Sequence, residues 1–282
     1  MDAESKLITL YLFVCDTMDL TLRDRRLRSR GFGPKLSDAE IMTMEIYGEI
    51  VGLRSDAAIW KHFHNHGASW FPNLGSYQTF ARQAANLGEM MQILFRSVMP
   101  PPSDVHSIDG FPIPVCRFVR AKRLRSYKGE AAYGYCATKD EHYYGFKGHV
   151  VIDLEGRIAG FVMTAANVDE RRVLPNFFGS IMGWLIGDKG YIGKDWAELA
   201  REQGLFLTTP LRSNMKDDRD PRIVEHFMDV RRRVETTIGQ LIDTFSCCAV
   251  RTRDLRHLVS RFVRKVVAYN FSLLHLEATA AV

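Results

Sequence analysis

The stretch from Trp184 to Tyr191 limits most narrowly the folds that this chain can adopt. It opens with three consecutive apolar residues, which predict a short strand that is covered on both faces of its sheet. Gly187 and Gly190 follow and allow the backbone to turn sharply. Asp188 therefore stands at the carboxyl end of a buried strand, where open α/β sheets place their sites.

The length and composition are those of an ordinary globular protein. The chain has 282 residues, of which 46% are hydrophobic, so it can form one large domain or two modest ones. No apolar run approaches the length of a membrane span, and the acidic start after Met1 is unlike a signal peptide. We therefore expect no membrane segment and a cytoplasmic location. The five cysteines are scattered without zinc-ligand spacing, which predicts reduced thiols.

Basic residues are unevenly distributed, although the net charge is only +5. The segment from Arg117 to Lys128 holds six bases and no acid. Further basic clusters lie at Arg23 to Arg30, Arg231 to Arg233 and Arg251 to Lys265. A single cluster is explained equally well as a solvated surface, but four clusters together favour nucleic-acid binding. We expect the bases of 117–128 and of 251–265 to contact phosphates.

The periodicity of apolar residues changes at Pro100 to Pro102, three prolines that cannot continue a helix. Before them, apolar residues recur at helical spacing over 3–22, from about Asp38 (where Ser37 and Glu40 have capping-box spacing), over 56–64, and from about Ser76 onward. We predict an all-helical N-terminal domain at 1–99 and a second domain at 103–282.

The second half alternates strands with helices. Strands are predicted at 105–115, 143–154, 157–165, 184–186 and 205–208, and helices at 169–179, 194–203, 223–245 and 255–276. A meander followed by α/β crossovers gives a mixed sheet with helices on both faces. The predicted class is α/β, with a ribonuclease-H-like mixed five-stranded sheet and flanking helices, preceded by the helical domain.

Three carboxylates fall at related places in this scheme. Asp109 lies on the first strand, Asp188 ends the fourth, and Glu235 lies on the helix after the fifth. In a sheet of this kind the first and fourth strands are central neighbours, so the three acids converge and repel one another unless cations lie between them. Magnesium or manganese suits such oxygen ligands, and two ions roughly 3.5–4 Å apart support in-line phosphoryl transfer.

Four segments carry a family resemblance. They are Ser107 to Gly110, Tyr144 to His149, Ile186 to Tyr191, and Arg231 to Glu235. Together they resemble the motifs of bacterial insertion-sequence DDE transposases. The resemblance implies a ribonuclease-H-like fold and metal-dependent DNA cleavage and strand transfer at transposon ends. It also implies the element's terminal inverted repeats and target DNA as partners, and a homodimer or higher oligomer on DNA. With DNA as the partner, we expect the helical domain at 1–99 to bind the DNA ends, the domain at 103–282 to be catalytic, and the protein to be nucleoid-associated.

Carried over by position, the resemblance makes Asp109, Asp188 and Glu235 the metal-binding catalytic acids. It also matches Arg231 to an arginine four residues before the glutamate. Many relatives have a tyrosine and a lysine where this chain has Met228 and Ile242, so DNA binding through those two positions does not carry over. The expected DNA-binding residues are Lys147, Arg231, Arg120, Lys122, Arg123 and Arg125. Lys147 either touches the DNA backbone or neutralises the acids.

Two other readings stay open. One is a nuclease or resolvase on the same fold, which cuts DNA without joining it. The other is a non-catalytic DNA-binding protein derived from a transposase. The presence of all three acids argues against this second alternative. His142 and His149 flank a strand, and a hydrogen-bonded structural role is favoured over metal binding for both. The segment after Gly190 lacks the spacing of a phosphate loop.

Overall fold

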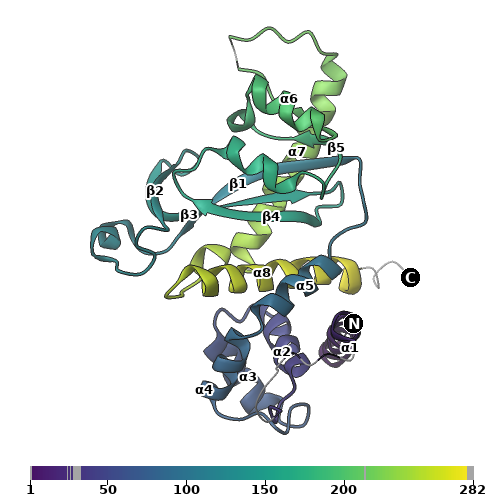
Figure 1. The fold of residues 1–282 in the computed structure, drawn as a ribbon, viewed down its shortest axis with the longest axis vertical. Helices are drawn as coiled ribbons and strands as arrows, with labels where there is room; N and C mark the ends of the chain where they lie inside the picture. The colour runs from purple at the N-terminus through teal and green to yellow at the C-terminus, as the bar shows by residue number, and fades with distance from the viewer. Residues whose placement is uncertain (1, 24, 26, 28–32, 213, 278–282) are drawn as a thin grey trace. The chain divides into compact units, whose positions relative to one another are not determined.

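The computed structural model describes residues 2–23, 25, 27, 33–212 and 214–277. The chain divides into two compact units (Figure 1). The helical unit combines Met1–Val98 with Thr244–Val282, and the α/β unit is Met99–Asp243. Most of the basic run from Arg23 to Arg30 lies outside the described residues.

The helical unit is built from short amphipathic helices. They are α1 (Ala3–Leu22), α2 (Asp38–Ile50), α3 (Asp56–His66), α4 (Tyr77–Ala85), α5 (Gly88–Ser97) and α8 (Leu255–Phe271), followed by a π-helical turn at Ser272–Glu277. The predicted capping box is confirmed, since Ser37 Oγ accepts from the Glu40 amide while the Glu40 carboxylate accepts from the Ser37 amide. The helix predicted from Ser76 onward is two helices, because the backbone leaves helical geometry at Leu87.

Helix α8 packs on α2 and α5, and an ionic network lies buried where they meet. Arg264 and Lys265 are each only 3% exposed. The Glu49 carboxylate lies 2.6 Å from Arg264 Nη2 and 2.6 Å from Lys265 Nζ. Arg264 also pairs with Glu45 and lies 3.1 Å from Asp56. Each buried cation therefore has carboxylate partners, as charges removed from water require.

This network corrects part of the sequence interpretation. Arg264 and Lys265 belong to the 251–265 basic cluster, but they cannot contact phosphates, since they are buried against acids of α2 and α3. It also accounts for a difference in domain organisation. The sequence prediction assigned all of 103–282 to the catalytic domain, whereas the segment from Thr244 onward belongs to the helical unit.

The α/β unit contains a mixed sheet, which confirms the predicted class. Its strands are β1 (Val105–Pro114), β2 (Ala132–Cys136), β3 (Glu141–Ile152), β4 (Ile158–Ala165), β5 (Gly183–Ile186) and β6 (Leu205–Thr208). The order is β2-β3-β1-β5-β6, with β4 also pairing β3. The described sheet has six strands rather than the five predicted. The extra strand, β2, is a short edge strand in which small residues alternate with tyrosines.

Helices cover both faces of this sheet (Figure 1). Helix α7 (Pro221–Asp243) packs on β1, β3 and β5. The other face is covered by α6 (Lys194–Glu202) and the 3₁₀ helix η2 (Glu170–Phe177), whose apolar side chains form one core with residues of β1, β3 and β5. The segment 169–179 was predicted as a helix and forms this 3₁₀ helix, with Asp169 as its N-cap.

Two apolar residues are more exposed than their patterns predicted. Trp184 was expected to be covered on both faces but is 43% exposed, and its ring packs on Phe206 of the edge strand β6 and on Phe227 of α7. Leu185 and the residue after it are fully buried, so the strand itself is central as predicted. Ile223 begins the apolar stripe of α7 but is 50% exposed, because the first turn of the helix extends beyond the core.

Among the described residues, no helix is both long enough and apolar enough to cross a lipid bilayer.

Candidate active site

The pairing of β1 with β5 places two of the predicted acids at neighbouring positions. These strands run parallel, and their last paired residues are Ser107 and Ile186. Asp109 and Asp188 each follow two residues later, so both leave the same end of this ladder. Asp188 then caps a 3₁₀ turn, where its Oδ1 accepts from the Gly190 amide at 2.7 Å. Asp109 Oδ1 similarly accepts from the following amide at 2.7 Å.

Helix α7 brings the third acid to the same end of the sheet. The Ser107 hydroxyl donates to the Val230 carbonyl of α7 at 3.3 Å, and the Thr237 hydroxyl donates to the Gly156 carbonyl at 3.1 Å. These bonds tie both halves of the helix to the sheet. Glu235 lies between them and accepts a charge-assisted hydrogen bond of 2.9 Å from Arg231, one turn earlier.

Asp109, Asp188 and Glu235 line one open cavity of about 550 Å³. Its wall also includes Arg231 and Lys147, two of the residues expected to contact DNA. Other lining residues come from β1, from the end of β2 and the turn that follows it, and from the second half of α7; they include Phe111, Pro112, Tyr135, Lys139, Ile238 and Ile242. The cavity is thus open to solvent and carries both acidic and basic side chains. We call it the acidic cavity, after Asp109, Asp188 and Glu235.

A fourth acid in this cavity, Glu170, was missed from the sequence. Its carboxylate accepts from Lys147 Nζ at 2.9 Å, and both side chains are about one-fifth exposed (24% and 18%). A Cβ on Gly190 would lie 2.0 Å from Glu170 Oε2, so glycine at 190 leaves room for this carboxylate. The sequence signal was only an acid beside the N-cap Asp169, which a helix start explains equally well.

The cavity raises the pKa of Asp109 to about 7. Burial is the largest cause, because it disfavours the charged carboxylate, and the hydrogen bond from the Gly110 amide opposes it. The negative charges of Asp188 and Glu170 raise the pKa further, whereas the Arg231 guanidinium lowers it. Asp109 therefore carries an unfavourable charge that a nearby cation would relieve.

A neutral hydrogen-bonded chain lies beneath the acids. His149 is fully buried, with its Nδ1 3.3 Å from the Tyr191 hydroxyl and its Nε2 3.2 Å from Thr164 Oγ1. Burial, with a smaller effect from Lys147, lowers the pKa of His149 to about 3, so the imidazole is neutral. The predicted structural role of His149 is confirmed. His142 is exposed and belongs to an aromatic cluster on β2 and β3.

The donor set fits a hard divalent cation. Asp109, Asp188, Glu235 and Glu170 offer only carboxylate oxygens, which are the ligands that Mg²⁺ and Mn²⁺ prefer. Among the described residues, however, no three acidic, imidazole or thiol groups are already arranged to hold a metal ion. Two of the four carboxylates are engaged by the cations Arg231 and Lys147 instead. The site is thus chemically suited to metal, with its acids balanced by basic side chains.

This electrostatic arrangement predicts how stability depends on pH. In protein freed of metal by a chelator, we expect Asp109→Asn to be more stable than wild type at pH 8, with the difference vanishing near pH 4. A carboxyl with a raised folded-state pKa stabilises the fold only while protonated, so its contribution is lost as pH rises from 3.8 through about 7. The upper limit of the difference is about 4 kcal/mol.

Urea unfolding at pH 4, 6 and 8 measures this effect. Glu225→Gln, an exposed site on α7, serves as the control and should follow wild type at each pH. Parallel pH profiles for Asp109→Asn and wild type would mean that the Asp109 carboxyl is not strained in the fold.

The expected phosphate-binding bases of 117–128 lie on an exposed segment. Residues Phe118–Arg123 form a 3₁₀ helix, η1, where no regular structure was predicted. Arg120, Lys122, Arg123 and Arg125 are all exposed to solvent. In the neighbouring cluster of α7, Arg232 pairs with Asp229 and Arg233 donates to the Leu154 carbonyl, so these two bases are satisfied locally.

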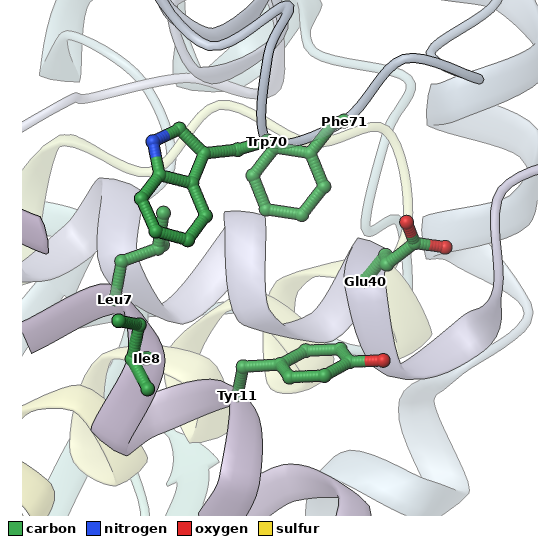
Figure 2. A pocket seen from close by; sticks show the side chains of 6 residues that line it. All are labelled: Leu7, Ile8, Tyr11, Glu40, Trp70 and Phe71. Carbon is green, nitrogen blue, oxygen red and sulfur yellow. The ribbon is translucent and has the colours of Figure 1, made fainter.

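A second cavity, of about 240 Å³, lies within the helical unit (Figure 2). Trp70 and Phe71 form one side, facing Leu7, Ile8 and Tyr11 of α1. Glu40 supplies the only carboxylate among its lining residues. This composition offers no set of converging polar groups for chemistry, in contrast to the acidic cavity of the α/β unit.

Comparison with known proteins identifies the family. The family model described as "Transposase DDE domain" matches residues 101–255, more than half of the chain. The chain belongs to the transposase DDE domain family. A solved cryo-EM structure, a piggyBac transposase synaptic complex with hairpin DNA, has a similar fold, with a TM-score of 0.54 and 9% identity. The match covers 99% of this chain and 76% of the other. No curated protein matches the sequence significantly.

The transposase DDE domain match spans the three acids and the whole sheet of the α/β unit. It also spans Met228 and Ile242. Ile242 lines the acidic cavity with an apolar side chain. Lys147 and Lys139 line the same cavity and supply positive charge from the sheet side.

Proposed function

We propose that this chain is an insertion-sequence transposase that cleaves DNA and transfers strands at the element's ends, using Mg²⁺ or Mn²⁺. The observation that carries the proposal is the convergence of Asp109, Asp188 and Glu235 on one open cavity. Cleavage of a phosphodiester requires charge stabilisation at both the attacking and the leaving oxygen. A cluster of carboxylates contributed by β1, the end of β5 and α7 is suited to that task through bound cations.

The metal, when bound, would be held by Asp109, Asp188 and Glu235 and would supply Lewis-acid stabilisation of the phosphoryl oxygens. The other residues act on DNA directly. Arg231 and Lys147 place positive charge in the cavity, where phosphate oxygens compete with their carboxylate partners. The buried Arg231 Nε–H has no hydrogen-bond partner among the described residues, so this donor is unsatisfied in the structure. Because His149 is neutral, it adds no positive charge that would repel a bound metal cation.

The proposal is tested with a supercoiled plasmid that carries the element's two ends. With Mg²⁺ or Mn²⁺, the full chain should nick or cut at the ends and join them to a target DNA. Cutting without joining would identify a nuclease or resolvase on this fold. Absence of any metal-dependent cleavage of cognate ends would point to a DNA-binding protein derived from a transposase and would refute the proposal.

DNA is the proposed partner, and its binding should depend on salt through the 117–128 segment. Replacing Arg120, Lys122, Arg123 and Arg125 together by Gln should weaken duplex binding and flatten the log–log salt slope. The slope should fall by about 0.9 for each phosphate that the variant no longer neutralises. Fluorescence anisotropy at several salt concentrations measures both quantities.

A matched variant controls for the change in net charge. It replaces four exposed bases elsewhere in the same unit by Gln, namely Lys194, Arg201, Lys216 and Arg222. This control should retain more of the wild-type slope than the 117–128 variant. Equal slopes for the two variants would show that the segment has no special role in binding DNA.

We further propose that the helical N-terminal region, residues 1–99, recognises the element's ends. The support for this proposal is that the chain divides into a compact helical unit and the α/β unit that carries the acids. Because α8 packs on α2 and α5, this unit includes α8 and cannot be removed by a simple truncation near Ser103. Oligomerisation on DNA, as a homodimer or a larger assembly, is part of the same proposal.

A further inference from the structure

Exposed aromatic rings gather on the edge of the sheet beside the acidic cavity. Tyr133 of β2 pairs across the ladder with Tyr144 of β3, and Tyr135 pairs with His142. The ring centroids of these two pairs lie 5.0 Å and 5.1 Å apart. Phe118 of η1 joins both pairs, 5.9 Å from Tyr133 and 6.1 Å from His142. These five residues form one contiguous group, the aromatic cluster.

Packing within the protein does not account for the cluster. Cross-strand aromatic pairs stabilise an edge strand modestly, and a larger gain requires that the rings be buried away from water. Phe118, Tyr133 and Tyr135 are instead 48%, 49% and 51% exposed. Large rings that keep half of their surface in water at neighbouring positions mark an interaction site.

The cluster lies on the same face of the sheet as Asp109. Residues paired across a ladder point to one face, and every second residue along a strand returns to it. Asp109 pairs with Val150 of β3, so the two side chains lie on the same face of the sheet. Tyr144 and His142 are an even number of residues from Val150 with no register shift between them, so they lie on that face too. Tyr135 belongs to the cluster and also lines the acidic cavity. The aromatic surface is therefore continuous with that cavity.

Positive charge flanks the rings on the segment that carries Phe118. Arg117, Arg120, Lys122 and Arg123 lie in or beside η1, and all are exposed. Within the described part of the chain, none of these four side chains forms a salt bridge. Exposed π-faces combined with unpaired cations suit a strand that offers both bases and phosphates. A phosphate-only ligand would leave the rings without a partner.

We propose that the aromatic cluster stacks unpaired nucleobases of a DNA strand that runs from the acidic cavity over β2, while the η1 bases hold its phosphates. This inference rests on the proposed function for the choice of DNA as ligand. The cluster would thereby position a locally unpaired strand next to the acids. Stacking tolerates any base, because every base has a π-face, so little sequence preference is expected here.

The test compares two probes on the full chain in a chelator, where cleavage cannot occur. One probe is a fluorescein-labelled dT oligonucleotide of about 12 nucleotides, within the range of single-strand site sizes, and the other is an abasic sugar-phosphate chain of the same length and charge. Wild type should bind the dT probe at least about tenfold more tightly, since each stacked base contributes a measurable share of affinity. Equal affinities for the two probes would overturn the proposal without any variant being needed.

Variants locate the stacking surface. Tyr133→Ala with Tyr135→Ala should abolish the preference for the dT probe, whereas Tyr133→Phe with Tyr135→Phe should preserve it, because the rings remain. Phe206→Ala is the matched control, since Phe206 is 46% exposed on β6, the opposite edge strand. Unchanged binding of the abasic probe and of duplex DNA would show that the Ala variant is folded.

The outcomes separate this inference from the proposed function. Suppose that the protein does not cleave DNA but prefers the dT probe, and that the Tyr133→Ala, Tyr135→Ala variant loses this preference. The stacking proposal would then be supported and the proposed transposase function refuted. DNA cleavage without any preference for the dT probe would support the proposed function and refute the stacking proposal. Tighter binding of anionic vesicles than of either oligonucleotide, abolished in the Ala pair, would assign the cluster to a lipid surface and overturn the inference.

Discussion

Cleavage of cognate DNA should fall by roughly three powers of ten or more when Asp188 is replaced by Asn or Glu235 by Gln. Each change keeps the shape of the side chain and removes one negative charge from the acidic cavity. An amide is a poor ligand for Mg²⁺, and the in-line transfer depends on cations for its charge stabilisation. Single-turnover cleavage of labelled element ends measures the decrease.

Binding should respond in the opposite sense. Removing a carboxylate that repels phosphate should leave duplex affinity unchanged or increase it. The matched variant is Glu225→Gln, which makes the same substitution at an exposed position earlier on α7 and outside the cavity. It should cleave and bind like wild type. If Glu235→Gln cleaved at the wild-type rate with Mg²⁺, the three-acid mechanism would be wrong.

The second large effect concerns the stability of the helical unit. Replacing Glu49 by Gln should destabilise this unit by about 3–5 kcal/mol, the range for breaking a buried ion pair by removing one partner. Glu49 is 2% exposed, and its carboxylate lies 2.6 Å from both Arg264 and Lys265. The change leaves Lys265 buried beside a neutral amide. Urea unfolding followed by circular dichroism in the far ultraviolet measures the shift.

The control for this variant is Glu89→Gln in the same unit. Glu89 lies in the first turn of α5 outside the buried network, where removing its charge costs at most about 1 kcal/mol through the helix dipole. Similar unfolding midpoints for the two variants would show that the buried network does not hold α8 to α2.

The central part of the site could be predicted because local patterns and strand order act together. A buried strand that ends at Asp188, next to a first strand carrying Asp109, leaves few places for either acid. The stripe of α7 likewise limited where Glu235 could point. Glu170 could not be found in this way, since its partner Lys147 is distant in sequence and meets it only through the placement of η2.

The same limit explains the errors in the basic clusters. Arg264 and Lys265 have the sequence signature of a basic surface, and periodicity gives the face of a helix without naming its neighbour. Only the packing of α8 on α2 reveals that Glu49 and its neighbours neutralise them. The edge strand β2 was missed because a five-residue segment with a central glycine carries too little periodicity to distinguish it from a loop.

The most direct test of the proposed metal site is to measure the binding of Mn²⁺ to the full chain, without DNA, by isothermal titration calorimetry. We expect wild type and Glu225→Gln to bind alike. Asp109→Asn, Asp188→Asn and Glu235→Gln should each weaken the affinity by about tenfold or more, the lower range seen when groups that support a metal site are changed. If wild type bound no Mn²⁺, or all three acid variants bound as wild type does, the claim that these carboxylates form one metal site would be contradicted.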